Sequence, residues 1–282
     1  MTRQGVVLAS DITSSMSFLY SNFIGRCLLK ILVQPFVSKT AGYFLSSKLS
    51  TLFISSFIQK NHIDMSEYKE VEYKSFNDFF TREIKDGARR ISTKNEDLVS
   101  PCDSKLSIYK INRECLLDVK GSLYTMEDIL QNKDLAKQYE DGYALVFRLS
   151  VDDYHRYMAI DHLEEKAHYK IKGIFHTVNP LASYYYPIYK QNAREVTVYQ
   201  SDHFGKITYI EVGAMMVGKI KNLPQKELNR GQIKGYFEFG GSTVVVLFQK
   251  NSIQIDEDLV KYNEQGYEVK IKMGEVIGKA SI

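Results

Sequence analysis

Hydrophobic and polar residues follow different patterns in the two parts of the chain. Between residues 12 and 63, aromatic and aliphatic residues recur at spacings of three and four, which is the spacing of one face of an α-helix. From about residue 97 onward, short stretches are rich in β-branched residues or alternate between apolar and polar residues, as β-strands do. We therefore predict an α+β protein, with N-terminal amphipathic helices followed by a mainly antiparallel, β-rich core.

The N-terminal part predicts two or three short amphipathic helices, the first of them interrupted at Pro35. Residues 12–63 contain no Asp or Glu, and their basic residues are Arg26, Lys30, Lys39, Lys48 and Lys60. Basic residues beside an apolar face are typical of helices that lie on an anionic bilayer. The alternative is that the helices pack on the rest of the protein with their lysines solvated. We treat residues 1–70 as a helical membrane-associating region and residues 71–282 as the β-rich domain.

Local signals mark further elements along the chain. Ser75 followed by Asp78 is a variant of the capping box, so we expect a short helix there, with Phe76, Phe79 and Phe80 on one face. The predicted strands are residues 105–111, 144–151, 167–174, 194–200, 207–212, 243–248 and 268–273. Residues 123–129 and 134–139 are predicted to be helical, and Gly274 is predicted to close a hairpin.

Composition narrows the class of protein. The chain has 282 residues, 44% of them hydrophobic and 25% charged, which is enough to bury a sizeable core. The net charge of +3 gives no reason to expect a nucleic-acid partner. Three cysteines, Cys27, Cys102 and Cys115, indicate neither a disulfide framework nor a zinc site and fit a reducing compartment. No stretch reaches 18 uncharged apolar residues, so we expect no transmembrane helix.

The stretch GYFEFGGSTVVVLF, from Gly235 to Phe248, places Gly240, Gly241 and Ser242 in a bend between two strand-like segments. Glycine has no Cβ, so a nucleophile can approach the carbonyl group of Gly241 closely. If the bend pressed the Ser242 hydroxyl onto that carbonyl, an N-to-O acyl shift would convert the peptide bond into an ester. Elimination of the ester would leave dehydroalanine, which hydrolyses to a pyruvoyl group. The alternative is an ordinary β-bulge.

Such a self-cleavage needs a base for Ser242 and a group that orients the base. His155, which directly follows a predicted strand, is the first candidate base, because histidine transfers protons near neutral pH. Asp103 is the candidate orienting group, although an Asp in this position could simply cap a turn. His162 and His168 are expected at the surface. The sequence has no HExxH motif and no cysteine pair, so we expect no metal site.

Six blocks of the sequence together resemble the phosphatidylserine decarboxylase family. In chain order they are FNDFFTREIKDGARRI (76–91), VSPCDSK (99–105), LSVDDYHRYM (149–158), HTVNP (176–180), EVGAMMVGKI (211–220) and GGST (240–243). The blocks fall in the family's order and extend from residue 76 to residue 243. The resemblance implies a proenzyme that cuts itself between Gly241 and Ser242 into a β chain (1–241) and an α chain (242–282). Ser242 would then become a pyruvoyl cofactor.

The resemblance also implies the reaction. The pyruvoyl carbonyl would form a Schiff base with the amine of phosphatidylserine and accept the electron pair that is released with CO2, giving phosphatidylethanolamine. The implied partners are phosphatidylserine, an anionic membrane surface and the two chains of the same proenzyme; a homodimer is compatible with the sequence but not specified by it. The implied location is peripheral, on the cytoplasmic face of the cell membrane. Candidate contacts for the phosphate head group are Arg82, Lys105 and Arg156.

The sequence departs from the family's pattern in two positions that matter. Gly240 stands where the LGST motif has leucine, and Met158 stands where the YHRxH motif has its second histidine, which the family assigns to an Asp–His–Ser triad. Methionine cannot accept a proton, so either His155 serves both cleavage and decarboxylation, or His176 replaces the missing histidine.

Two other functions remain open from the sequence. One is a lipid-ester hydrolase that uses Ser242, His155 and Asp103, although the G-x-S-x-G motif of many hydrolases is missing. The other is a lipid-binding family member that lost its activity with Met158.

Overall fold

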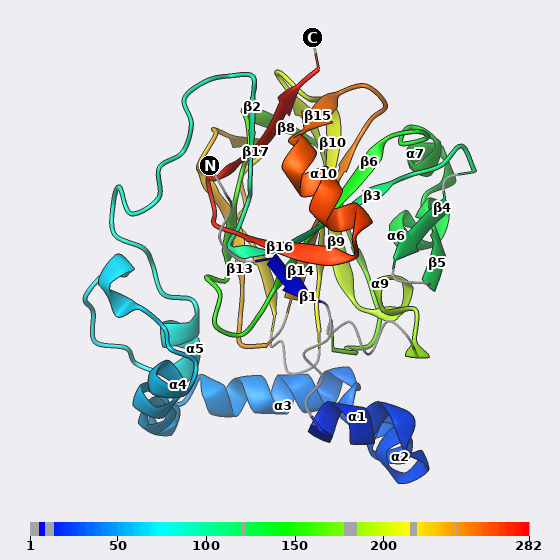
Figure 1. Cartoon of the computed structure of the whole chain (residues 1–282). Helices are drawn as coiled ribbons and strands as arrows, with labels where there is room; N and C mark the ends of the chain where they lie inside the picture. The colour runs from blue at the N-terminus through cyan, green and yellow to red at the C-terminus, as the bar shows by residue number, and fades with distance from the viewer. Residues whose placement is uncertain are drawn as a thin grey trace.

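The computed structural model describes residues 6–8, 14–114, 116–119, 122–177, 185–214, 219–240 and 242–281. A layer of helices lies across one end of a β-rich core, and the strands of the core run roughly perpendicular to that layer (Figure 1). This arrangement confirms the predicted α+β class, with N-terminal helices followed by a mainly antiparallel core.

The core is built on one large sheet of nine strands, in the order β1-β16-β3-β6-β14-β10-β9-β8-β12, in which every pair is antiparallel. The strands are β1 (Val6–Leu8), β16 (Tyr267–Ile271), β3 (Ser104–Lys110), β6 (Tyr143–Leu149), β14 (Ser242–Phe248), β10 (Gly205–Val212), β9 (Arg194–Ser201), β8 (Leu163–Ile171) and β12 (Glu227–Leu228). Each strand that the sequence predicted by its residue range is confirmed in this sheet, with ends that differ by a few residues.

Further strands of three to five residues form smaller sheets, and only the one before the glycine bend, Ile233–Phe237, was predicted. They are β11 (Ile220–Asn222), β13 (Ile233–Phe237) and β7 (Arg156–Met158) in one sheet, β15 (Ile253–Ile255), β17 (Val276–Ala280) and β2 (Asp97–Val99) in another, and the pair β4 (Leu116–Val119) and β5 (Ser122–Thr125). Gly274 does form a turn, with φ of 86°, but the predicted hairpin is wrong. The strands on its two sides belong to different sheets, since β16 pairs with β3 and β17 pairs with β2 and β15.

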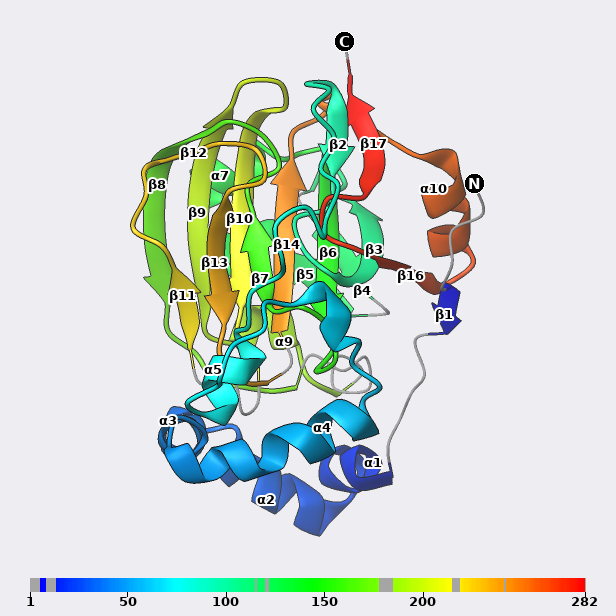
Figure 2. The same ribbon diagram turned by 90° about the vertical axis from the view of Figure 1, so that its left-hand side faces the viewer.

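Strand β14 lies in the middle of the large sheet, and all of its residues are buried. Val244 and Val246 join a core cluster with residues of the β11-β13-β7 sheet, which covers one face (Figure 2). Val245 and Leu247 point to the other face, which is covered by α6 (Met126–Leu130), α7 (Lys133–Lys137) and α9 (Ile188–Gln191). The alternation follows from the two-residue period of a strand, and coverage on both faces explains the unbroken apolar run.

The helical layer contains more and shorter helices than the sequence predicted. They are α1 (Ser14–Ser21), α2 (Phe23–Leu32), α3 (Pro35–Leu45), the 3-10 helix η1 (Lys48–Phe53) and α4 (Ile54–Lys60), followed by η2 (Met65–Glu67) and α5 (Phe76–Phe80); α10 (Glu257–Glu264) lies near the C-terminus. Pro35 occupies the first turn of α3, where its missing N–H costs nothing, so it separates two helices. The capping prediction is confirmed, since the Asp78 N–H donates to the Ser75 Oγ atom at 3.1 Å.

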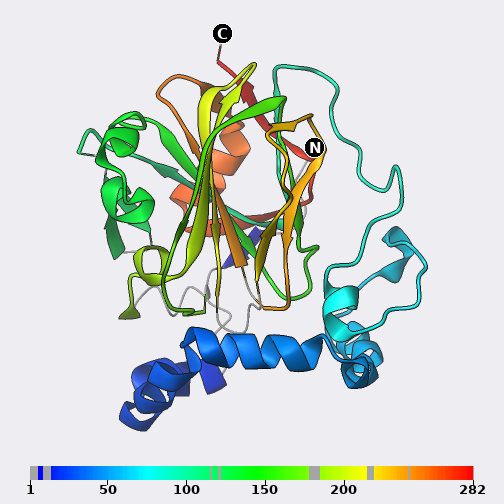
Figure 3. The same cartoon turned by 180° about the vertical axis from the view of Figure 1, so that it is seen from behind.

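The layer lies against the end of the large sheet at which β14 begins and β6 and β10 end (Figures 2 and 3). Tyr20, Leu29 and Val33 from α1, α2 and the turn after α2 join the core cluster on one face of the sheet. The start of β14 is therefore enclosed between the sheets and the helical layer. Ser242 is the first residue of that strand.

Candidate active site

The Gly-Gly-Ser segment connects two sheets. Strand β13 ends at Phe237 and β14 begins at Ser242, and the two strands belong to different sheets. The expected bend is confirmed by Gly240, whose φ of 139° lies in a region that side chains disfavour. It lies in the crossover between two sheets, so the segment is not an ordinary β-bulge within one sheet. Gly241 lies outside the described residues.

Ser242 combines burial with an unused hydroxyl group. It pairs with Leu149 of β6 and is 0% exposed, and its Oγ atom has no hydrogen-bond partner among the described residues. Buried hydroxyl groups normally have partners, because an unsatisfied one costs free energy. An unpaired Oγ atom next to the glycine bend is therefore available for a reaction.

His155 lies beside the same segment. Its ring is fully buried and 4.1 Å from the ring of Phe80, measured between centroids, and a backbone group of Gly240 faces the imidazole. The Nδ1 atom lies 2.9 Å from the backbone oxygen of Asp153. A carbonyl oxygen only accepts hydrogen bonds, so Nδ1 carries the proton and Nε2 is left with its lone pair. That Nε2 atom is buried and has no partner in the described part of the chain.

Burial sets the protonation state of His155. It lowers the pKa of the imidazole to about 3, with a smaller contribution in the same direction from the positive charge of Arg82, because a low-dielectric environment disfavours the charged form. The ring is therefore neutral at pH 7 and can accept a proton. The neighbouring Asp153 shows the opposite effect, since burial and then the charge of Asp152 raise its pKa to about 7.

Asp103 does not contact His155 in this structure. Its Oδ2 atom accepts from Arg89 at 2.9 Å and its Oδ1 atom accepts from the Met273 N–H at 2.7 Å. Arg89 is also paired with Glu67 at 2.9 Å. The group on His155 Nδ1 is the Asp153 carbonyl, so the expected orienting contact from Asp103 is replaced by a backbone one. A catalytic part for Asp103 stays a prediction from the resemblance.

Met158, at the position of the family's second histidine, is fully buried in the core. Its N–H donates to the Pro101 carbonyl at 2.9 Å, two residues before Asp103. The structure therefore places this position next to the Asp103 segment, as a triad would require, but the side chain there is a thioether.

His176 belongs to a different environment. Its ring stacks on Tyr186 at 4.4 Å between centroids, and its Nδ1 atom lies 3.3 Å from the hydroxyl oxygen of Tyr20. Asn192 binds both its N–H and its carbonyl group, and burial lowers its pKa to about 4. No contact among the described residues joins His176 to Ser242 or His155. Residues 178–180 of the HTVNP block and residues 215–218 of the EVGAMMVGKI block lie outside the described residues.

Two of the three basic residues expected near the head group, Arg82 and Arg156, are engaged within the protein. Arg82 is buried, with its guanidinium group 4.2 Å from the centre of the Tyr68 ring, and it donates to the Tyr68 hydroxyl at 3.1 Å. Arg156 donates to the Thr81 carbonyl at 2.9 Å. Lys105 is partly exposed on β3. These contacts do not reveal a head-group site.

Sequence reasoning missed Asn77, whose side chain accepts a hydrogen bond from the Phe239 N–H at 3.1 Å. It also missed the part played by the Asp153 carbonyl group. Asn77 carries no local signal, because only the fold brings it to a residue 162 positions away. The Asp153 contact is local, two residues from His155, but a backbone oxygen is present at every position and leaves no pattern in the sequence.

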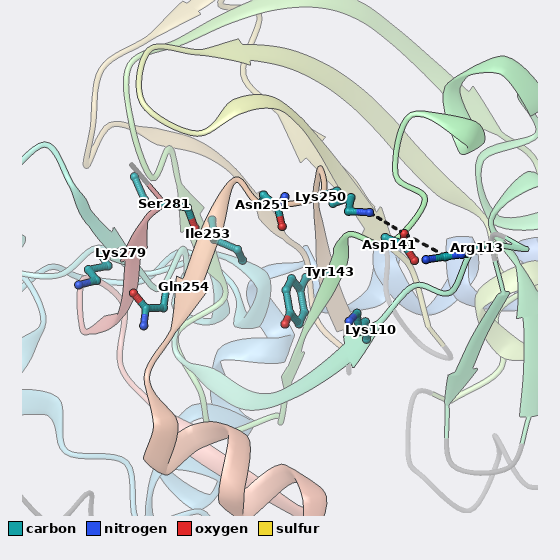
Figure 4. Close-up of a pocket in the computed structure, with 11 residues that line it drawn as sticks. Lys110, Arg113, Asp141, Tyr143, Lys250, Asn251, Ile253, Gln254, Lys279 and Ser281 are labelled. Atoms are coloured by element: carbon teal, nitrogen blue, oxygen red, sulfur yellow. Dashed lines mark hydrogen bonds and ion pairs between the residues drawn. The ribbon is translucent and has the colours of Figure 1, made fainter.

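A cavity lies at the end of β14 away from Ser242, beside Tyr143, which pairs with Phe248; Figure 4 shows the residues that line it. It measures about 800 Å³ and is lined by basic residues, two of which, Lys250 and Arg113, are paired with Asp141 at 2.9 and 3.6 Å. A smaller cavity of about 150 Å³ borders Asp103, Asp153 and Tyr68. No cluster of three or more metal-binding side chains is found among the described residues.

Comparisons with known proteins point to one family. The family model described as phosphatidylserine decarboxylase matches residues 76–279. The chain is 46% identical to phosphatidylserine decarboxylase proenzyme 2 of Clostridium acetobutylicum, over 94% of this chain and 92% of the relative. It is 41% identical to a phosphatidylserine decarboxylase proenzyme of Clostridium tetani (94% and 91%) and 40% identical to one of Clostridium botulinum (93% and 92%). The chain belongs to the phosphatidylserine decarboxylase family.

Proposed function

We propose that this protein is a self-cleaving phosphatidylserine decarboxylase, which converts phosphatidylserine into phosphatidylethanolamine and CO2. Two observations carry the proposal. The Ser242 Oγ atom and the His155 Nε2 atom are both buried without a hydrogen-bond partner among the described residues, and each residue lies beside the glycine bend; the chain's relatives are named proenzymes.

In the first step of the proposed cleavage, His155 Nε2 takes the proton of the Ser242 hydroxyl and Oγ attacks the carbonyl carbon of Gly241. The C–N bond of the peptide breaks, the proton passes to the released amino group, and an ester joins Gly241 to Ser242 Oγ. Removal of the Ser242 α-proton then expels Gly241 as a carboxylate and leaves dehydroalanine. Hydrolysis of dehydroalanine releases ammonia and leaves a pyruvoyl group on the α chain.

The position of Ser242 suits the pyruvoyl group that it would carry. That group supplies an electron sink for the loss of CO2 from the substrate. The chain's own residues then have two tasks, which we assign to His155 and the apolar residues around it. His155 moves protons at the cleavage segment, and Phe80 and Phe239, whose ring centroids are 5.0 Å apart, exclude water from it.

We further propose that the helical layer binds an anionic membrane surface peripherally, on the cytoplasmic face of the cell membrane. Its helices carry most of the exposed large hydrophobic side chains of the described chain, among them Leu52 (78% exposed) and Phe23 (73%). Lys30, Lys39 and Lys48 are exposed on the same layer. Large exposed apolar patches beside basic residues are typical of membrane-binding surfaces. None of the described helices is long and apolar enough to cross a bilayer.

The hydrolase alternative gains no support. A hydrolase that acts on lipid esters needs a serine that the substrate can reach, whereas Ser242 is 0% exposed in the uncut chain.

Intact-mass analysis and a CO2 assay with phosphatidylserine vesicles test the proposal together. We expect a β chain of residues 1–241, a pyruvoyl-blocked α chain of residues 242–282, and release of CO2. A single uncut chain that releases fatty acid would establish the hydrolase, and a single chain without either activity would establish a binding protein.

A further inference from the structure

The segment before the cleavage site is held by a side chain from a distant part of the sequence. The Phe239 N–H, two residues before Gly241, donates to the Oδ1 atom of Asn77 at 3.1 Å. Asn77 lies on α5 and is only 7% exposed. The two residues are 162 positions apart in the sequence.

The other end of the Asn77 carboxamide is fixed to the helical layer. Its Nδ2 atom donates to the Ser46 Oγ atom at 2.9 Å and points to the Gly42 carbonyl oxygen at 3.4 Å. Because one side of the carboxamide accepts and the other donates, these partners define its orientation. The side chain therefore bridges α3 and the backbone of the cleavage segment.

This bridge lies where the sheet cannot hold the chain. Ser242, on the far side of the cleavage site, is held by its pairing with Leu149. On the near side β13 ends at Phe237, and the last bond to the neighbouring strand segment runs from the Glu238 N–H to the Lys219 carbonyl at 3.0 Å. The chain then passes through Phe239 and Gly240, whose backbone is unusually free. The Phe239 ring packs 5.1 Å from the Phe76 ring, between centroids, but ring packing does not fix the peptide plane. The hydrogen bond to Asn77 does.

We propose that Asn77 is a positioning residue for self-cleavage: it fixes the Phe239 peptide, two residues before the cleavage site, relative to the Ser242 hydroxyl. The inference rests on the self-cleavage proposed above. Intramolecular attack depends steeply on position, and a displacement of about 1 Å can cost a factor of about 100 in rate.

The test is the cleavage rate of the full-length chain, followed on denaturing gels after a short pulse of cell-free synthesis. Asn77→Leu removes both hydrogen bonds and should slow cleavage at least ~10-fold. Asn77→Asp keeps an acceptor for the Phe239 N–H and should restore the rate to within ~3-fold of the wild type. Should Asn77→Leu lack the wild-type far-UV circular dichroism, Asn77→Ser, whose shorter side chain cannot reach Phe239, replaces it with the same expected slowing.

Asn263 offers a matched control. Its side chain accepts from the Ile108 N–H at 3.0 Å and donates to the Ile108 carbonyl at 2.6 Å, which is a comparable pair of bonds between α10 and β3, away from the cleavage segment. Asn263→Leu should therefore lower thermal stability without changing the cleavage rate.

The outcomes separate the two proposals. If the wild-type chain is cut and Asn77→Leu is cut equally fast, Asn77 has no positioning role while self-cleavage stands. The same conclusion follows if Asn77→Asp is as slow as Asn77→Leu. A wild-type chain that is never cut overturns both proposals.

Discussion

The Nδ1 atom of His155 lies 2.9 Å from the backbone oxygen of Asp153. A peptide carbonyl carries no net charge, so this contact fixes the tautomer of the ring without adding the stabilisation that a carboxylate would give to an imidazolium. The basicity of His155 is therefore set mainly by burial. Relative to the expected triad, a backbone atom has taken the place of the Asp103 carboxylate.

Replacing each of the two candidate histidines by alanine should separate their roles. We expect His155→Ala to remain uncut, because the Ser242 hydroxyl loses its base, and His176→Ala to be cut at the wild-type rate. His176→Ala should still lower the free energy of unfolding by about 1–3 kcal/mol, because Tyr186 and Tyr20 lose their contacts with the imidazole ring. Gel analysis and urea unfolding measure the two effects. Normal cutting of a folded His155→Ala would place the base elsewhere.

The low pKa of His155 predicts how cleavage responds to pH. A pKa of about 3 leaves the ring neutral from pH 8 to pH 5, so the cleavage rate should not fall across that range. Rates measured in buffered cell-free reactions check this. An acid limb centred near pH 6.5, the ordinary value for histidine, would mean that the ring is solvated when it reacts.

The same pKa predicts a stability effect. Between pH 3 and 6.5 the unfolded chain binds a proton on His155 that the folded chain does not. The neutral, buried His155 therefore contributes stability that is fully present above about pH 6.5 and is lost as the pH falls through that window. Asp153, with its pKa raised to about 7, contributes in the opposite sense. Urea unfolding of Ser242→Ala with and without His155→Gln isolates the His155 contribution, which should vanish in the double variant.

Ser242→Ala should give one uncut chain without decarboxylase activity. Its stability should equal or exceed that of the wild-type proenzyme, because the substitution removes a buried hydroxyl group without a partner. Thr243 is a matched control, since its Oγ1 atom is equally buried and also lacks a partner among the described residues. Thr243→Val should be cut normally, and intact mass distinguishes the two variants. Cleavage of Ser242→Ala would disprove the proposed site.

Charge reversal on the helical layer should weaken membrane binding. Replacing Lys30, Lys39 and Lys48 by Glu should cost at least about 1 kcal/mol of binding free energy per lysine and leave self-cleavage unchanged. Sedimentation with anionic liposomes measures the loss of membrane binding. The control makes the same charge change at the other end of the core, at Lys110, Lys250 and Lys279 (Figure 4). Equal sedimentation of the two triple variants would show that the helices only pack on the protein.

A buried ion pair should support the β core. The Nζ atom of Lys234 lies 2.9 Å from Glu211 Oε1, with side chains 2% and 0% exposed. Lys234→Met leaves a buried carboxylate without its cation, which should lower the free energy of unfolding by about 3–5 kcal/mol. Lys170→Met removes an exposed partner of Glu195 and should cost at most about 1 kcal/mol. Urea unfolding in the Ser242→Ala background compares the free energies of unfolding of the two variants.

The sequence by itself determined the long strands, the capped helix at Ser75 and the family. Strands of seven or more residues, such as β6 and β14, carry enough β-branched and apolar residues to be recognised locally. The cap is a contact between Ser75 and Asp78, three residues apart. The six ordered blocks were enough to recognise the family, because each block is a continuous stretch of sequence.

The tertiary structure alone decided which residues meet. Short strands such as β7 and β2 have too few residues to show a period, and their pairing depends on partners far along the chain. His155 and His176 both lie in local settings that suit a base, and only packing places one beside Gly240 and the other beside Tyr186. The Asn77 bridge joins residues 162 positions apart. A single side-chain-to-backbone hydrogen bond leaves no pattern in the sequence, because the backbone atom it binds is the same whatever residue stands there.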